Sequence, residues 1–222
     1  EGVIDFSVKV RPLAEIAGDN DLNLGIKYEV KNYAQFNIGQ MGTATSTPVA
    51  SEDTKSNVIT NKINSDLRLS EQIRYFNEDN IAVGSGPLPP KVGQTTGFKV
   101  YWRLTNNLHE LENLKVITVL PSYVAWDDKA RATVGNLNYD SASRQVTWDV
   151  GRLPITVYEL DAEFNIGVTP TETDKNKIMV LLSGTKAEAQ DMETQSAITK
   201  TMPAKTTKLT DDDIAATDGI VE

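Results

Sequence analysis

The sequence predicts an all-β protein made of tandem immunoglobulin-like antiparallel β-sandwiches. Two observations support this fold class. Apolar and polar residues alternate with a period of two along most of the chain, and breakers rich in Gly, Pro, Asn and Asp separate the alternating runs. No long amphipathic helix is predicted between the runs, which favours antiparallel sandwiches over a parallel α/β sheet.

The alternating runs define the expected strands. In chain order they lie at residues 4–10, 22–31, 67–75, 98–105, 114–120, 145–150, 160–169 and 178–183. Glu71 is the one residue that breaks the apolar face of its run. Trp102, Trp126 and Trp148 are expected to supply most of the aromatic core. Residues 185–196 are rich in helix formers but have no apolar stripe, so we expect a loop with one helical turn there.

An internal repeat sets the expected domain organisation. Residues 5–12 align with residues 163–170 through an acidic residue, a Phe and a terminal Pro. The repeat predicts that residues 1–65 are the C-terminal half of one immunoglobulin-like module. Residues 66–210 would then be a complete module, and residues 211–222 an acidic C-terminal segment. The opening strands of the first module come either from a longer chain in cis or from another subunit in trans, and the sequence leaves both open.

Composition excludes several classes of function. The 222-residue chain has a net charge of −9 and no basic cluster beyond Lys129 and Arg131, which argues against nucleic-acid binding. It has no Cys, so disulfides and thiolate metal sites are impossible. No run approaches the roughly 20 apolar residues of a membrane-spanning helix, and no signal peptide is recognised, so we expect any targeting segment to lie outside this sequence.

Catalytic motifs are missing from the sequence. The single histidine, His109, lies in a polar turn, and no nucleophile-elbow, phosphate-loop or zinc-protease pattern occurs. A catalytic triad or a histidine-based metal site normally needs more than this. We therefore expect a protein that is not an enzyme and has no required cofactor.

Two acidic segments suggest calcium as a weakly bound ion. Carboxylate oxygens are the ligands that Ca²⁺ prefers, but neither segment has the spacing of an EF-hand. A solvated turn and a solvated tail are the alternative interpretations. The candidate metal ligands are Asp19, Asp21, Asp211, Asp212, Asp213 and Asp218.

A resemblance to a known family rests on motifs in residues 57–222. The string Gly84–Thr96 (GSGPLPPKVGQTT) is followed by residues 102–106 (WRLTN), Trp126 and residues 146–153 (VTWDVGRL). This order resembles the repeated immunoglobulin-like domains of large uncharacterised surface proteins of candidate-phylum (ultra-small) bacteria. The acidic residues 211–213 and the last residues are similar to the closing segment of those proteins. The resemblance implies a location on the cell surface.

The sequence thus predicts a non-catalytic extracellular structural protein of a cell-surface stalk, coat or filament. Its expected partners are copies of itself or adjacent immunoglobulin-like modules, joined in part by strand addition at the half-module. The alternative is an adhesin-type binding module that recognises a host protein or glycan. The exposed faces, rich in Thr, Asn and Lys, fit that alternative, but no cluster in the sequence identifies a site. An accessory domain of a hydrolase would need a catalytic domain outside this chain.

Overall fold

The structure is a computed structural model that describes residues 28–34 and 56–222. The chain divides into two compact units, Glu1–Ile63 and Asn64–Glu222. The expected strand at 4–10, the start of the strand at 22–31 and the first copy of the repeat lie outside the described residues. In unit 1 the described residues form an antiparallel hairpin of β1 (Glu29–Asn32) and β2 (Ile59–Lys62).

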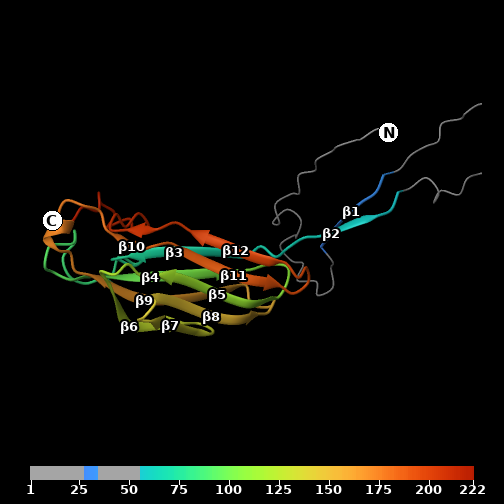
Figure 1. The fold of residues 1–222 in the computed structure, drawn as a ribbon, viewed down its shortest axis with the longest axis horizontal. Coiled ribbons are helices and arrows are strands. Elements are labelled where there is room, and N and C mark those ends of the chain that lie inside the picture. The colour runs from blue at the N-terminus through green and yellow to red at the C-terminus, as the bar shows by residue number, and fades with distance from the viewer. Residues whose placement is uncertain (1–27, 35–55) are drawn as a thin grey trace, which may run out of the picture. The chain divides into compact units, whose positions relative to one another are not determined.

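Unit 2 is a sandwich of two antiparallel sheets (Figure 1). One sheet has the strand order β3-β4-β9-β6, and the other has the order β12-β11-β5-β8-β7. The strands of the first are β3 (Arg68–Arg74), β4 (Thr96–Thr105), β6 (Val124–Ala132) and β9 (Glu159–Val168). The strands of the second are β5 (Leu111–Val119), β7 (Asn136–Asp140), β8 (Gln145–Leu153), β11 (Thr185–Asp191) and β12 (Ala197–Met202). The predicted all-β antiparallel sandwich is confirmed.

Three short elements complete unit 2. A 3-10 turn, η1, spans Glu172–Asp174, and β10 (Val180–Leu182) pairs with β13 (Lys205–Thr206). Within residues 28–34 and 56–222, no helix has the length and apolarity needed to cross a membrane.

The core lies between the two sheets and follows the predicted alternation. Along β4, Phe98, Val100, Trp102 and Leu104 are buried, while the residues between them are partly or fully exposed. Trp102 and Trp148 are fully buried, as expected. Trp126 is only half-buried, which corrects the prediction that all three tryptophans fill the core. It lies on the edge strand β6, where its ring stacks on Tyr139 at a centroid distance of 5.2 Å.

The segment 185–196 departs from its sequence prediction. It begins with a strand, β11, which pairs with β5 on one side and β12 on the other. Its inward residues are Thr185, Ala187, Ala189 and Asp191, two of them alanines and two polar. These small or polar residues bury as a strand face without producing an apolar stripe in the sequence, and this is why the strand was missed.

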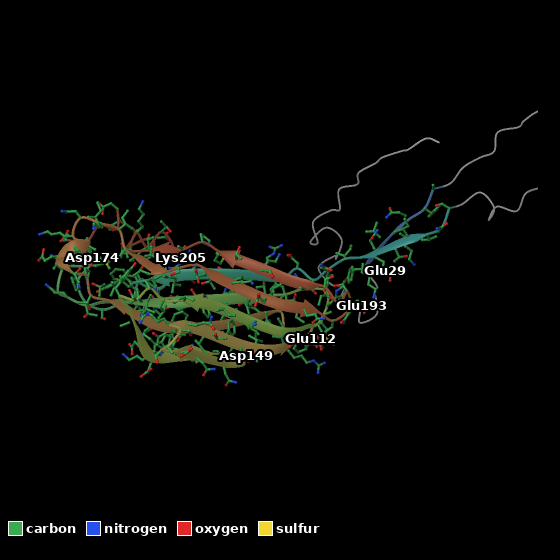
Figure 2. All side chains as sticks on the ribbon, viewed as in Figure 1. Glu29, Glu112, Asp149, Asp174, Glu193 and Lys205 are labelled. Carbon is green, nitrogen blue, oxygen red and sulfur yellow. The ribbon has the colours of Figure 1, made fainter. Side chains whose placement is uncertain are left out.

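The chain begins and ends unit 2 at opposite ends of the sandwich (Figure 1). Ser65 lies just before β3, at the end where Asp191 closes β11, and we call this the Ser65 end. β3 then runs to the other end, where the backbone N–H of Val92 donates to the carbonyl of Glu222, and we call this the Glu222 end. In Figure 2 the labelled Glu193 lies near the Ser65 end and the labelled Asp174 near the Glu222 end.

Candidate functional site

Three carboxylate side chains are buried in unit 2, among residues that are otherwise mostly apolar. Glu71 is 2% exposed, Asp191 0% and Asp212 1%. Burying a carboxylate is costly unless hydrogen bonds or an opposite charge compensate for the lost water. The partners of each carboxylate therefore indicate what it does.

Asp191 joins three segments of the chain at the Ser65 end. Its Oδ2 accepts a hydrogen bond from the backbone N–H of Ser65 at 2.8 Å and lies 3.0 Å from Nδ1 of His109. Its Oδ1 accepts the backbone N–H groups of Glu193 and Thr194, each at 2.9 Å. The carboxylate thus fixes the start of unit 2 to the turn after β11 and to the β4–β5 connection.

The pKa of the Asp191 carboxyl is lowered to about 2. Burial alone raises this pKa, but the hydrogen bonds from Thr194, Ser65 and His109 together outweigh it. Asp191 is therefore ionised throughout the ordinary pH range.

Ser65, His109 and Asp191 are the residue types of a catalytic triad, but their contacts are those of a structural tie. The Ser65 hydroxyl donates to the backbone carbonyl of His109 at 3.2 Å and accepts its backbone N–H at 3.1 Å. Nucleophile activation needs the hydroxyl to bond the imidazole instead. Sequence analysis placed His109 in a polar turn and did not link it to Asp191, which lies 82 residues away.

Asp212 fixes the C-terminal segment to the two residues that follow the edge strand β3 at the Glu222 end. Its Oδ2 accepts the backbone N–H groups of Tyr75 at 2.8 Å and Phe76 at 2.7 Å. Its Oδ1 accepts those of Ile214 at 3.1 Å and Ala215 at 2.9 Å. Burial raises the pKa of Asp212, but these four backbone bonds lower it below the usual value.

Asp211 and the last residues add further contacts at the same end. Asp211 accepts the backbone N–H of Ile73 at 3.3 Å and pairs with Lys205, whose Nζ lies 2.9 and 2.8 Å from its two oxygens. Val221 exchanges backbone bonds with Asn176 and Lys177, each at 3.0 Å. The acidic C-terminal segment is therefore packed onto the sandwich and contacts the chain at the end of β3.

Glu71 connects the two sheets in the middle of the sandwich. It lies on β3, and its Oε2 accepts Trp102 Nε1 at 2.7 Å and the hydroxyl of Thr185 on β11 in the opposite sheet. Its Oε1 is buried with no hydrogen-bond partner. Burial raises the pKa of Glu71, although the bonds from Thr185 and Trp102 and the charge of Lys205 act against that rise. The residue that broke the apolar pattern of its strand is thus the polar contact between the sheets.

The calcium candidates fall into two groups. Asp19 and Asp21 lie outside the described residues. Of the others, Asp211 and Asp212 direct their oxygens to backbone N–H groups and Lys205, while Asp213 and Asp218 are exposed. Over the described ranges, no group of three or more His, Cys, Asp or Glu residues has an arrangement that could hold a metal ion.

Several solved structures share part of this fold, but no known protein family and no curated protein matches the sequence. The chain is similar to BcpA, the major pilin subunit of Bacillus cereus, with 11% identity, a TM-score of 0.42 and coverage of 67% of this chain and 44% of the pilin. It is also similar to the full-length major pilin SpaD from Corynebacterium diphtheriae, with 4% identity, a TM-score of 0.38 and coverage of 63% and 35%. The matched part thus spans less than half of each pilin, and likeness at this level does not decide function.

Asp212 and its neighbour Asp213 form a matched pair for testing the tie at the Glu222 end. Asp212→Asn places an amide NH₂ against backbone N–H groups that now face an oxygen, so we expect a loss of about 3 kcal/mol of unfolding free energy. Asp213→Asn changes the same charge on an exposed side chain, and we expect a change within about 0.5 kcal/mol. Urea denaturation of both variants measures the difference. Equal losses would show that the four backbone bonds of Asp212 do not stabilise the fold.

The lowered pKa of Asp191 predicts the sign of a pH effect. Because the folded-state pKa of about 2 lies below the unfolded value of about 3.9, the ionised carboxylate stabilises the fold fully at neutral pH. This stabilisation is lost as pH falls from about 4 towards 2. Urea midpoints of wild type and Asp191→Asn should therefore differ most at pH 7 and converge below pH 4. A difference that stays constant from pH 7 to pH 3 would refute the assignment.

Proposed function

We propose that unit 2 is a load-bearing, non-catalytic structural module of a protein on the outside of a bacterial cell. In this role it acts as one element of a stalk, coat or filament. The observation that carries the proposal is the way the chain is held at both ends of the sandwich, by Asp191 at the Ser65 end and by Asp212 at the Glu222 end. Catalysis has no part in the proposal, since each of these carboxylates accepts several hydrogen bonds from the protein itself.

The strand arrangement supports resistance to pulling. β3 runs from the Ser65 end to the Glu222 end and pairs with β4 over seven residues, from Arg68↔Thr105 to Arg74↔Lys99. A force applied at Ser65 and Glu222 acts along β3, so these hydrogen bonds are loaded together in shear and cannot open one at a time. Asp191 and Asp212 lie where that force first reaches the sandwich, and they fix the chain there to neighbouring segments.

Unit 1 supports the second part of the proposal, in which modules or subunits join by strand addition. Its described residues form only the two-stranded hairpin β1–β2, and all four residues of β2 are exposed. A two-stranded hairpin is marginally stable on its own. It therefore needs more strands, from the rest of unit 1 or from another chain, and we propose that a neighbouring module or subunit supplies them.

Pulling the full chain between its two ends in an optical trap tests the load-bearing role. We expect unit 2 to unfold in one step that releases about 550 Å of chain. Asp191→Asn and Asp212→Asn should each unfold at least tenfold faster at a given force, because each removes a tie at one loaded end. Asp213→Asn should behave like the wild type. Equal unfolding rates for all four proteins would contradict the proposal.

Sedimentation of the full chain at several concentrations tests strand addition. We expect species larger than the 24.4 kDa monomer to accumulate as concentration rises. Ile63 N–H donates to Tyr28 O, so these two residues form a hydrogen-bonded pair of the β1–β2 ladder. Hydrogen-bonded and non-hydrogen-bonded pairs alternate along an antiparallel ladder, and Lys31↔Thr60 is a non-hydrogen-bonded pair. The N–H groups of Lys31 and Thr60 therefore face the outer edges of the hairpin. Lys31→Pro or Thr60→Pro should therefore abolish the association without removing a bond inside the hairpin. A monomer at every concentration would refute strand addition and leave the load-bearing role intact.

A further inference from the structure

The outward face of the β3-β4-β9-β6 sheet contains a hollow of about 650 Å³. An outward sheet face is normally flat, but here the turn after β3 and the residues that follow β6 rise on either side of it. The volume lies within the roughly 300–1,000 Å³ of typical small-ligand sites. The hollow is therefore large enough for a short chain of sugar rings or a compound of similar size.

The floor of the hollow is a row of side chains from adjacent strands. Gln72 on β3 pairs in register with Tyr101 on β4, and Tyr101 pairs with Glu163 on β9. Tyr101 is the aromatic side chain of this row and is half-buried. Burial and the charge of Glu163 raise the pKa of Tyr101, so its hydroxyl remains a hydrogen-bond donor at any physiological pH.

Both walls are held in place by hydrogen bonds. On one side, Asn77 Oδ1 accepts the backbone N–H groups of Asp79 at 3.0 Å and Ile81 at 2.9 Å, which fixes the turn. On the other side, the Thr133 hydroxyl donates to Asp161 O at 3.1 Å and accepts Asp161 N–H at 3.0 Å. The hollow is thus preformed, which lowers the entropy cost of binding.

The charges that line the hollow nearly cancel. Three arginines and four carboxylates line it, and each arginine pairs with one of the carboxylates, so the hollow has no strong net field to attract a polyanion or a polycation. The pairs are Arg103–Asp161 at 2.8 Å, Arg131–Glu163 at 3.5 Å and Arg74–Glu78 at 3.8 Å. They present donors and acceptors side by side, an arrangement that suits the neighbouring hydroxyls of a sugar.

Peptides fit this surface less well than sugars. Extended peptides add to sheet edges, helical peptides need an apolar groove, and phosphopeptides need unpaired arginines. The hollow lies on a sheet face, is lined by polar and charged residues together with their apolar stems, and has its arginines already paired. Neutral sugars instead combine many hydroxyls with an apolar C–H face that packs on an aromatic ring such as Tyr101.

We propose that this hollow, with Tyr101 and Gln72 on its floor, is a binding site for a neutral oligosaccharide of two or three units. The proposed sugar site does not depend on the load-bearing role. The sugar site lies on the outward face of the sheet, whereas the contacts of Asp191 and Asp212 lie at the two ends of the sandwich. A structural module with such a site would also adhere to glycans on a surface.

NMR titration of the full chain with maltotriose, cellotriose, triacetylchitotriose and mannotriose, all neutral sugars, tests the site. We expect at least one of them to bind with a dissociation constant of about 1 mM or tighter. Tyr101→Ala should weaken that binding at least tenfold, and Gln72→Ala, a smaller change on the same floor, at least threefold. The matched control is Tyr123→Ala, which removes another partly exposed tyrosine outside the hollow and should leave binding unchanged.

Three results would overturn the proposal. The first is no binding of any of the four sugars at 10 mM sugar. The second is binding that survives both Tyr101→Ala and Gln72→Ala. The third is binding of sialyllactose or of an acidic or basic peptide alone, because a hollow whose charges nearly cancel gives no reason for that preference. Urea midpoints of the variants, measured in parallel, confirm that each remains folded during the titration.

Discussion

The carboxylate of Asp212 is the contact on which the Glu222 end of unit 2 depends. β3 is an edge strand, and the N–H groups of Tyr75 and Phe76 would otherwise be left without partners at the margin of the sheet. Such unpaired edges invite association with other chains. Asp212 satisfies them and, through Ile214 and Ala215, orders the segment that covers them. One side chain thus pairs the N–H groups that follow β3 and anchors the chain end.

The strands with a buried face were predictable because their alternation is strong. β4 and β9 place one apolar side chain inward at every second position, and the predicted runs at 98–105 and 160–169 overlap them almost completely. β6 and β7 were missed. β6 is an edge strand with a bulge between Asp127 and Ala130, and Val124 is its only buried residue, so it has little periodicity to detect. A strand could be predicted from the sequence when one of its faces is buried, because burial requires apolar residues at every second position; strand propensity contributed less.

The three buried carboxylates could be predicted only in part from the sequence, because their partners are distant along the chain. Glu71 broke an apolar face, which marked it as unusual, but its partner Thr185 lies 114 residues away on a strand that the sequence did not reveal. Asp191 and Asp212 looked like ordinary turn and tail residues, because their role comes from backbone N–H groups of distant segments. A single sequence contains no signal for such long-range backbone contacts, and the acidic tail was accordingly interpreted through its charge, as a possible calcium ligand or a solvated segment.

Charged side chains are stabilised differently in the interior of the sandwich and on the outer face of the β3-β4-β9-β6 sheet. Inside, Asp191 and Asp212 are stabilised by backbone N–H groups that cannot move away, so their ionised forms become part of the fold. Outside, carboxylates face arginines and lysines across strands, as in the pair Lys99–Glu163 at 3.0 Å, where water screens the interaction and the contribution to stability is small. Changes to the outer row therefore cost the fold little. This separation allows one sandwich to keep a hydrogen-bonded interior while the side chains of its outer face are free to vary.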